Sequence, residues 1–307
     1  MKKYSFFLAT IVPLLLSGQQ PMYFNNIYNN NGFNTKGYSI IDDGNGYVGY
    51  GLTKDENVYQ LLFFYKYSYE GVLEEFKTFY EPYHEYYAGN IGGAMKQSVD
   101  GNYYFAYHLD YGGSTYGRLM KMDQNLDTIW TKYYLIDDYL TMPWNSNTTY
   151  DQGFIIIGSA WESGIDLDIL LIKTDSLGNH SCNSVIGGEW AEQGTNVVQT
   201  PDGGYLIGGY FWKPGIDHSL DAMVVKTDSL GNEEWTKYYG NPDVDDDMAF
   251  VALANDGNYL VATVYGEYIW TNEERAGRIY LIKIDENGDI VWENKMGRNR
   301  CGCYEEL

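Results

Sequence analysis

The sequence predicts an all-β protein, and within that class a β-propeller of four-stranded antiparallel blades. Three observations lead there. A turn signal of Asp, Gly and an aromatic residue occurs five times along the 307 residues, and a Lys-x-Asp signal follows it at a nearly constant distance. No segment shows the period of an amphipathic helix. Repeated units of about 50 residues with turn residues at both ends are typical of propeller blades. We expect five blades, with six or seven blades, or an incomplete propeller, as alternatives.

The turn signal divides the expected propeller domain, residues 19–307, into five units. These start near residues 43, 100, 151, 202 and 256. Their anchoring aromatics are Tyr47, Tyr103, Phe154, Tyr205 and Tyr259. The second signal reads Lys121-Met122-Asp123, Lys173-Thr174-Asp175, Lys226-Thr227-Asp228 and Lys283-Ile284-Asp285, with a degenerate first copy, Lys66-Tyr67-Ser68. So many matching offsets exclude chance as their origin.

Each unit is expected to hold four short strands, which we name A to D after the fourth copy. Strand A is Leu206 to Tyr210 and strand B is Ala222 to Lys226, both rich in β-forming residues. Strand C is Glu233 to Tyr239 and strand D is Met248 to Ala254. The Asp-Ser-Leu-Gly-Asn segment at 228–232 suits a tight B–C hairpin, because Asp caps backbone amides and Gly accepts a positive φ. The Asp-Gly signal does the same between strand D and the next strand A.

Aromatic residues of strand C are expected to pack between neighbouring blades. In three copies a Trp stands seven residues after the Asp of the second signal, at Trp130, Trp235 and Trp292, while the third copy has Cys182 there. The segment 37–42 resembles a strand D ahead of the first strand A, and nothing like a strand D follows Trp292. We therefore expect the N-terminal strand to complete the last blade, which would close the ring and leave no open sheet edge.

The net charge and the N-terminal segment limit the cellular compartment and the binding partners that the protein can have. With 42 acidic and 20 basic residues the formal charge is −22, which argues against nucleic acid and anionic membranes as partners. Lys2, Lys3, the apolar run from Phe6 to Leu16 and Ser17-Gly18-Gln19 match a secretory signal peptide over residues 1–18. That run falls short of the roughly 20 residues needed to span a bilayer. We expect a secreted or cell-surface protein without membrane insertion after signal removal, and a monomer.

The repeat resembles that of a known group of propellers. The run from Ile279 to Trp292, an apolar strand followed by Asp, a Gly turn and Trp, is similar to PQQ-type propeller repeats. Together with Asp202-Gly203-Gly204-Tyr205 it most resembles repeat-propeller proteins secreted by Bacteroidetes-type bacteria. The resemblance implies the fold and implies little about activity, because every matching residue is a turn or packing residue. The cysteine, acidic and basic ligands of a quinone site are not found, so no cofactor is carried over.

The loops that differ between copies are the expected binding face. A–B and C–D loops leave the same side of a propeller, and here the A–B loops are long, varied and rich in aromatic residues. Exposed Trp and Tyr favour stacking on sugars or anchoring a protein partner. The candidate ligand-binding residues are Trp161, Tyr210, Trp212, Tyr265, Tyr268 and Trp270. The competing interpretation is that most of these rings pack down onto the scaffold.

The acidic loop on that side is the best candidate for a metal site. Asp243, Asp245 and Asp247 alternate, and their carboxylates are the hard oxygen ligands that calcium takes. An EF-hand is excluded because Met248 stands where its Gly belongs. The alternative is an acidic loop that keeps the surface soluble. Calcium is therefore the one ion considered, and otherwise no cofactor is expected.

These observations favour a secreted, non-catalytic propeller that binds a glycan or protein ligand through its A–B/C–D loop face. No residue is assigned a catalytic role, and an enzyme is less expected than a binding module. The first alternative is a secreted carbohydrate-active hydrolase or lyase with a carboxylate pair in the central funnel. The second alternative is a purely structural surface module.

Overall fold

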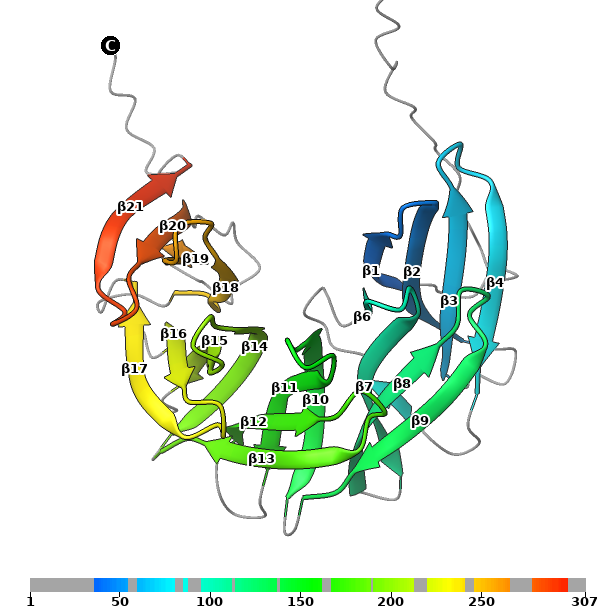
Figure 1. The fold of residues 1–307 in the computed structure, drawn as a ribbon, viewed down its shortest axis with the longest axis horizontal. Coiled ribbons are helices and arrows are strands. Elements are labelled where there is room, and N and C mark those ends of the chain that lie inside the picture. The colour runs from blue at the N-terminus through cyan, green and yellow to red at the C-terminus, as the bar shows by residue number, and fades with distance from the viewer. Residues whose placement is uncertain are drawn as a thin grey trace, which may run out of the picture.

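The chain folds into five antiparallel sheets that follow one another in sequence (Figure 1). This computed structural model describes residues 36–54, 60–80, 85–87, 95–111, 114–136, 139–161, 167–188, 190–212, 220–240, 246–265 and 278–297. All regular elements in these ranges are strands, and they include no helix that could cross a membrane. The predicted signal peptide, residues 1–18, lies outside the described residues.

Each sheet is built from one continuous stretch of chain. The first sheet contains β1 (Lys36–Asp42), β2 (Gly46–Lys54), β3 (Gln60–Ser68) and β4 (Leu73–Phe79). The second contains β5 (Glu85–Tyr87), β6 (Met95–Gln97), β7 (Tyr103–Tyr111), β8 (Ser114–Met122) and β9 (Thr128–Tyr134). The third contains β10 (Leu140–Thr148), β11 (Phe154–Trp161), β12 (Leu167–Thr174) and β13 (His180–Ile186). The fourth contains β14 (Ala191–Gln199), β15 (Tyr205–Trp212), β16 (Leu220–Thr227) and β17 (Glu233–Tyr239). The fifth contains β18 (Phe250–Leu253), β19 (Tyr259–Tyr265), β20 (Arg278–Ile284) and β21 (Ile290–Met296).

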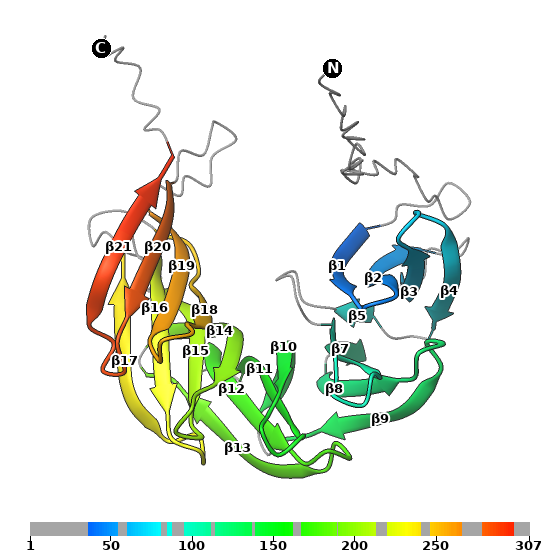
Figure 2. The same cartoon turned by 45° about the horizontal axis from the view of Figure 1, so that its top comes forward.

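The all-β propeller prediction is confirmed, whereas the predicted ring closure is wrong. Strand D of each expected unit pairs with the strand A that follows it, so every sheet has the strand order D-A-B-C. β1 accordingly pairs with β2 in its own sheet and does not complete the last one. The reason is local, since the Asp-Gly turn at residues 42–46 joins β1 to β2 as a tight antiparallel hairpin. Figures 1 and 2 show the result, an open arc with the first and last sheets at its two ends.

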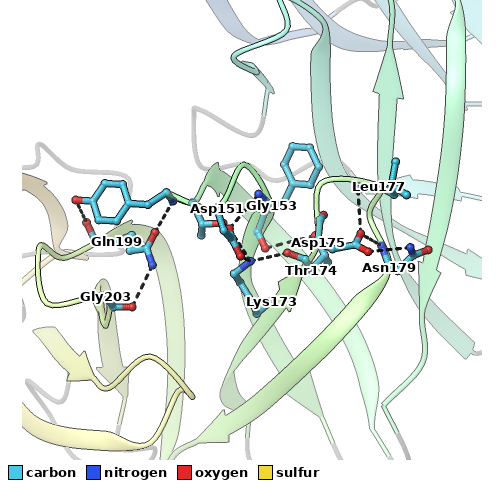
Figure 3. Close-up of polar contacts among 12 residues, drawn as sticks. Asp151, Gly153, Lys173, Thr174, Asp175, Leu177, Asn179, Gln199 and Gly203 are labelled. Atoms are coloured by element: carbon cyan, nitrogen blue, oxygen red, sulfur yellow. Dashed lines mark hydrogen bonds and ion pairs between the residues drawn. The ribbon is translucent and has the colours of Figure 1, made fainter.

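An ion pair joins the two repeated sequence signals inside each sheet. The Lys of the second signal reaches the Asp of the turn signal, as in Lys173 Nζ to Asp151 Oδ2 at 2.8 Å (Figure 3). The same Nζ donates to the Thr174 carbonyl at 2.6 Å. The equivalent pairs are Lys66–Asp43, Lys121–Asp100, Lys226–Asp202 and Lys283–Asp256. The degenerate first copy therefore keeps the same contact.

The turn at the Lys-x-Asp signal orders the hairpin between the last two strands of its sheet, and side chains of the preceding sheet contact it. Asp175 Oδ1 accepts hydrogen bonds from the amides of Leu177 and Asn179 at 2.9 and 2.8 Å (Figure 3). Gly178 then takes a φ of +74°, a conformation that favours glycine. The Trp130 ring of the preceding sheet lies so close that a Cβ at Gly178 would be 2.6 Å from it. The Tyr134 hydroxyl donates to the Gly178 carbonyl at 2.9 Å.

The fourth and fifth sheets meet in the same way. Trp235 Nε1 donates to the Glu286 carbonyl at 3.1 Å, and the Tyr239 hydroxyl donates to the Gly288 carbonyl at 2.7 Å. The predicted role of Trp130 and Trp235 between blades is confirmed. It is wrong for Trp292, which is 41% exposed because no described sheet follows the fifth.

Four apolar cores fill the four junctions between successive sheets. The junction of the fourth and fifth sheets, for example, buries Leu206, Val224 and Tyr239 against Tyr280 and Ile282. Each remaining junction contains a comparable cluster of buried side chains. The hydrophobic contribution to stability is therefore divided among the junctions.

Side chains of the innermost strands also bind the neighbouring inner strand. Asn196 of β14 donates to the Val251 carbonyl at 2.7 Å and accepts from the Val251 amide at 2.9 Å. Asn145 and Asn147 of β10 donate to the carbonyls of Thr195 and Val197, both at 3.3 Å. These contacts satisfy backbone groups that would otherwise be unpaired at the inner edges of the fourth and fifth sheets.

The Lys–Asp pairs predict acid sensitivity. Burial alone would raise the pKa of Asp151, but hydrogen bonds from Lys173, Thr149 and the Gly153 amide outweigh it and lower the pKa to about 2. Asp202 has a pKa of about 2 through Thr200, Lys226 and Gly204, again against an opposing effect of burial. A folded-state pKa below the ordinary value stabilises the fold above about pH 4, and the stabilisation is lost as the pH falls towards about 2.

We therefore expect the melting temperature to fall between about pH 4 and pH 2. A double variant, Asp151→Asn with Asp202→Asn, should melt lower at neutral pH and lose less on acidification. Circular dichroism melts across this range measure both effects. An equally steep acid loss in the double variant would contradict this origin. The partly exposed carboxylates make the expected change modest.

Candidate functional site

Two of the predicted binding residues lie exposed at equivalent strand ends. Trp161 is the last residue of β11 and Trp212 the last of β15, with 38% and 47% of their surface exposed. They pair with Leu140 and Ala191 at the start of the respective inner strands. The third and fourth sheets thus present one indole each on the side from which the A–B loops leave.

Two other predicted residues are held in the scaffold. The Tyr210 hydroxyl donates to the Gln193 side chain, and burial followed by the charge of Asp247 raises the pKa of Tyr210 to about 12. The Tyr265 ring meets Tyr280 edge-on at 5.2 Å between centroids. Lys295 Nζ lies 3.6 Å from the centre of the Tyr265 ring. Tyr268 and Trp270 lie outside the described residues.

Only one of the three predicted calcium ligands lies within the described residues. Asp247 leads into β18, and its carboxylate accepts from the Met248 amide at 2.8 Å. Asp243 and Asp245 lie outside the described residues. Among the residues that the structure describes, no three acidic, His or Cys side chains are grouped closely enough to hold a metal. The calcium site stays a prediction.

A pocket of about 190 Å³ lies between the third and fourth sheets and has two carboxylates in its wall. Glu192 enters from β14 and is only 6% exposed, while Glu233 enters from the solvent-facing start of β17. The other polar side chains are Thr236, which donates to Glu233 at 2.8 Å, and Tyr238. The apolar wall consists of Ile169, Ile186, Met223 and Val225, and Gly187 and Gly188 complete the lining.

The pocket lies where the repeat departs from its pattern. Strand C ends in a buried Tyr in the second and fourth sheets, Tyr134 and Tyr239, and each ring reaches the next sheet. The third sheet has Ile186 at this position and Cys182 in place of the Trp. Ile186 lines the pocket, and its shorter side chain does not fill the space that a ring occupies at the other three junctions.

Tyr238 lines the pocket together with the two carboxylates. Tyr238 is 54% exposed and meets the Phe211 ring edge-on at 5.5 Å. Its pKa is raised, first by partial burial and then by the charges of Glu192, Glu233 and Asp221. Glu192 also accepts a hydrogen bond from the Gly188 amide at 3.4 Å. Two carboxylates and a hydroxyl therefore line one pocket with an apolar wall, and acid–base chemistry on a sugar requires groups of this kind.

A second, larger pocket lacks this chemistry. It has a volume of about 550 Å³ and runs along β1. Its described lining includes Tyr38, Tyr65 and Lys96, and no carboxylate is among these described residues. Size alone does not make it the better candidate, because a functional site also needs convergent polar groups.

Glu192 and Glu233 were not predicted as site residues from the sequence. Among 42 acidic residues, neither stands in a recognisable motif. The signal that was available is the loss of the Tyr anchor in the third copy, at Ile186. Where one copy of a repeat lacks a packing residue that the other copies have, space is left at that junction for a binding or catalytic site.

Comparison with known proteins gives structural likeness only. No protein-family model matches the chain, and no curated protein sequence does either. Among solved structures, it is similar to an endo-arabinase from Bacteroides thetaiotaomicron, with 10% identity, a TM-score of 0.44 and coverage of 80% of this chain and 92% of the arabinase. An α-L-arabinofuranosidase from Lactobacillus brevis shares 10% identity at a TM-score of 0.46, over 82% and 91% of the two chains. A xylan β-1,4-xylosidase from Bacillus halodurans shares 15% identity at a TM-score of 0.43, over 86% and 55%.

These neighbours correct the function expected from the sequence. These three proteins are named as hydrolases, and the comparison contradicts the leading expectation of a non-catalytic binding module. It also does not favour the expectation that the protein is not an enzyme. The alternative expectation, a carbohydrate-active hydrolase, agrees with them better. An initiation factor and a prolyl oligopeptidase are also similar at 10% and 12% identity, so the likeness itself is one of fold.

Proposed function

We propose that the protein hydrolyses glycosidic bonds in the pocket between its third and fourth sheets. The observation that carries the proposal is that Glu192, Glu233 and Tyr238 line the same pocket. Glycoside hydrolysis needs two carboxyl groups, one to protonate the leaving oxygen and one to activate water or attack the anomeric carbon. The sequence-based alternative placed such a pair in the central funnel, whereas here the pair lies between two sheets.

The pocket wall favours a neutral sugar. No Lys, Arg or His is among its described lining residues, so nothing there would compensate the charge of a uronic acid beside two carboxylates. The apolar side chains suit the C–H face of a pyranose or furanose ring. Trp212 directly follows Phe211, which contacts Tyr238, so its indole points to the opposite face of the fourth sheet, away from the pocket.

The proposal includes export from the cell. It rests on Lys2, Lys3, the apolar run after them and the small residues at 17–18, the pattern of a signal peptide. A polysaccharide too large to enter the cell needs an enzyme outside it. Processing is measured by N-terminal sequencing of the protein recovered from the culture medium.

The test is hydrolysis of neutral polysaccharides by wild type and two isosteric variants. Arabinan, xylan and β-1,3-galactan form the first panel, because proteins of similar fold are named for acting on such chains. Glu192→Gln and Glu233→Gln should each lower kcat by about 100- to 10,000-fold with little change in KM. Proton NMR of the first product reports retention or inversion at the anomeric carbon, which the separation of the carboxyl groups determines.

Asp247→Asn is the matched control, because this carboxylate lies outside the pocket. Its kcat should stay within about threefold of wild type. Trp212→Ala should likewise leave kcat and KM nearly unchanged, because this side chain points to the other face of the fourth sheet. Full activity in both glutamine variants, or a wild type inert on the whole panel, would contradict the proposal.

A further inference from the structure

The indole of Trp161 lies on the face of the third sheet that meets the fourth sheet. Side chains alternate along β11, so Trp161 shares its side with Ile155 and Ile157. Both isoleucines are buried in the core between the third and fourth sheets, whereas Ile156 and Ala160 lie in the core between the second and third sheets. β11 pairs with β12 without a bulge along its whole length, so the alternation holds to the end of the strand. Trp161 therefore belongs to the junction that contains the pocket.

The pocket wall begins close to Trp161 on that face. Ser159 comes two residues before Trp161 and pairs with Ile169 of β12, which lines the pocket. Two residues along a strand span about 7 Å. From the fourth sheet, β14 packs against β11 and β12, and it carries Glu192 into the same pocket. Trp161 is therefore a near neighbour of the pocket and stands just outside its described wall.

The indole is exposed where its neighbours on the same face are buried. Trp161 is 38% exposed, whereas Ile157 and Ser159 are both 0% exposed. Within the described part of the chain, its ring has no aromatic or cationic partner and its Nε1 makes no hydrogen bond. By contrast, Trp144 donates from Nε1 to Ser159 at 3.0 Å, and Trp235 donates to a backbone carbonyl at 3.1 Å. Trp161 thus offers a free apolar ring face and a free donor, the two features by which an indole binds a sugar.

The pocket is too small for more than one sugar unit. Its volume of about 190 Å³ is below the roughly 300 to 1,000 Å³ of sites that enclose a drug-sized ligand. The other units of a glycan chain must therefore lie outside it, on the surface of the junction. Trp161 presents its free ring there, two residues along β11 from the partner of the pocket residue Ile169.

We propose that Trp161 stacks on the sugar unit next to the one held in the pocket, so that the substrate is a neutral glycan chain of at least two units. This inference rests on the proposed function of the pocket. An indole binds the C–H face of a sugar ring without adding charge, in keeping with a described wall that has no basic residue. The stacked unit does not change during the reaction, so Trp161 contributes to KM and not to kcat. Trp161 therefore determines the preference for chain length.

The test compares substrates of different length in wild type and Trp161→Ala. On oligosaccharides of two or more units from arabinan, xylan or β-1,3-galactan, the substitution should raise KM by about 5- to 30-fold with little change in kcat. On a glycosyl fluoride, which has one sugar and no second ring, the two proteins should have equal kcat/KM. Trp161→Phe keeps an aromatic ring and should recover most of the lost affinity.

Isothermal titration with the same oligosaccharides reads binding without turnover, in wild type or in the Glu192→Gln background. Trp161→Ala should weaken the affinity by a similar factor. A protein that binds these chains through Trp161 and cleaves none would contradict hydrolysis alone. An active enzyme whose Trp161→Ala variant binds and cleaves like wild type would contradict the stacking role alone. A wild type that binds none of the chains would overturn both.

Trp212→Ala is the matched control, because Trp212 ends β15 as Trp161 ends β11 and is 47% exposed. Alternation along β15 puts Trp212 on the side of Leu206, which is buried in the core between the fourth and fifth sheets. This variant should keep the KM and the affinity of wild type on every chain. Equal losses in Trp161→Ala and Trp212→Ala, or a loss on the glycosyl fluoride as large as that on the chains, would overturn the proposal.

Discussion

Replacing Tyr239 with Ala should lower the free energy of unfolding by about 3 to 5 kcal/mol. Its ring is 6% exposed in the core between the fourth and fifth sheets, and its hydroxyl binds the Gly288 carbonyl at 2.7 Å. The substitution therefore opens a cavity and leaves a buried carbonyl without its donor. Tyr239→Phe keeps the ring and should cost only about 1 kcal/mol. Chemical denaturation with urea measures both values.

Met296→Ala is the matched control for Tyr239→Ala. Met296 has the same place in the fifth sheet and is 44% exposed. Met296→Ala should change the free energy of unfolding by less than about 1 kcal/mol. Equal losses at the two positions would show that the junctions do not carry the stability of the arc.

Asn196→Ala should have the second largest effect, about 2 to 4 kcal/mol. One side chain both donates to the Val251 carbonyl and accepts from the Val251 amide, at 2.7 and 2.9 Å. Its removal leaves two backbone groups unpaired at the junction of β14 and β18. Asn196→Asp keeps the acceptor, loses the donor and adds a charge, and we expect it to be no better tolerated. Thermal melts of the purified variants give the comparison.

Asn147→Ala provides the graded control. Asn147 donates a single bond of 3.3 Å to the Val197 carbonyl. A loss of about 1 kcal/mol is expected. If Asn147→Ala cost as much as Asn196→Ala, the number of backbone groups satisfied would not explain the effect.

The sequence predicted the sheets because the residues that form them act locally. Asp151 and Lys173 meet within one sheet, and Asp175 orders its own hairpin, so both leave a signal in every repeat. Whether the five sheets close into a ring could not be predicted in this way. Whether the first strand joins the last sheet depends on groups hundreds of residues apart, and no repeated residue reports that choice. The tight turn after Asp42 decided it for the first sheet.

The pocket could not be predicted from the sequence for a different reason. Repeat analysis gives weight to what recurs, and the pocket exists because Ile186 does not repeat the Tyr of the neighbouring copies. Glu192 and Glu233 then line it from the first and last strands of the fourth sheet, and neither repeats in the other copies as a signal. The rim residues were easier to find, because Trp161 and Trp212 stand at equivalent strand ends, whereas Tyr210 is held by Gln193.

Because each sheet is one uninterrupted stretch of chain, the molecule can gain or lose a sheet without breaking any other. A ring whose last sheet borrows a strand from the first has a fixed number of sheets and unfolds as a whole. An open arc behaves as a linear array in which stability accumulates unit by unit and fraying begins at the ends. A gene of this kind can change length by unequal crossing-over between repeats, and the product still folds. The junction that contains Glu192 lies in the interior of the array, away from the ends where such changes act.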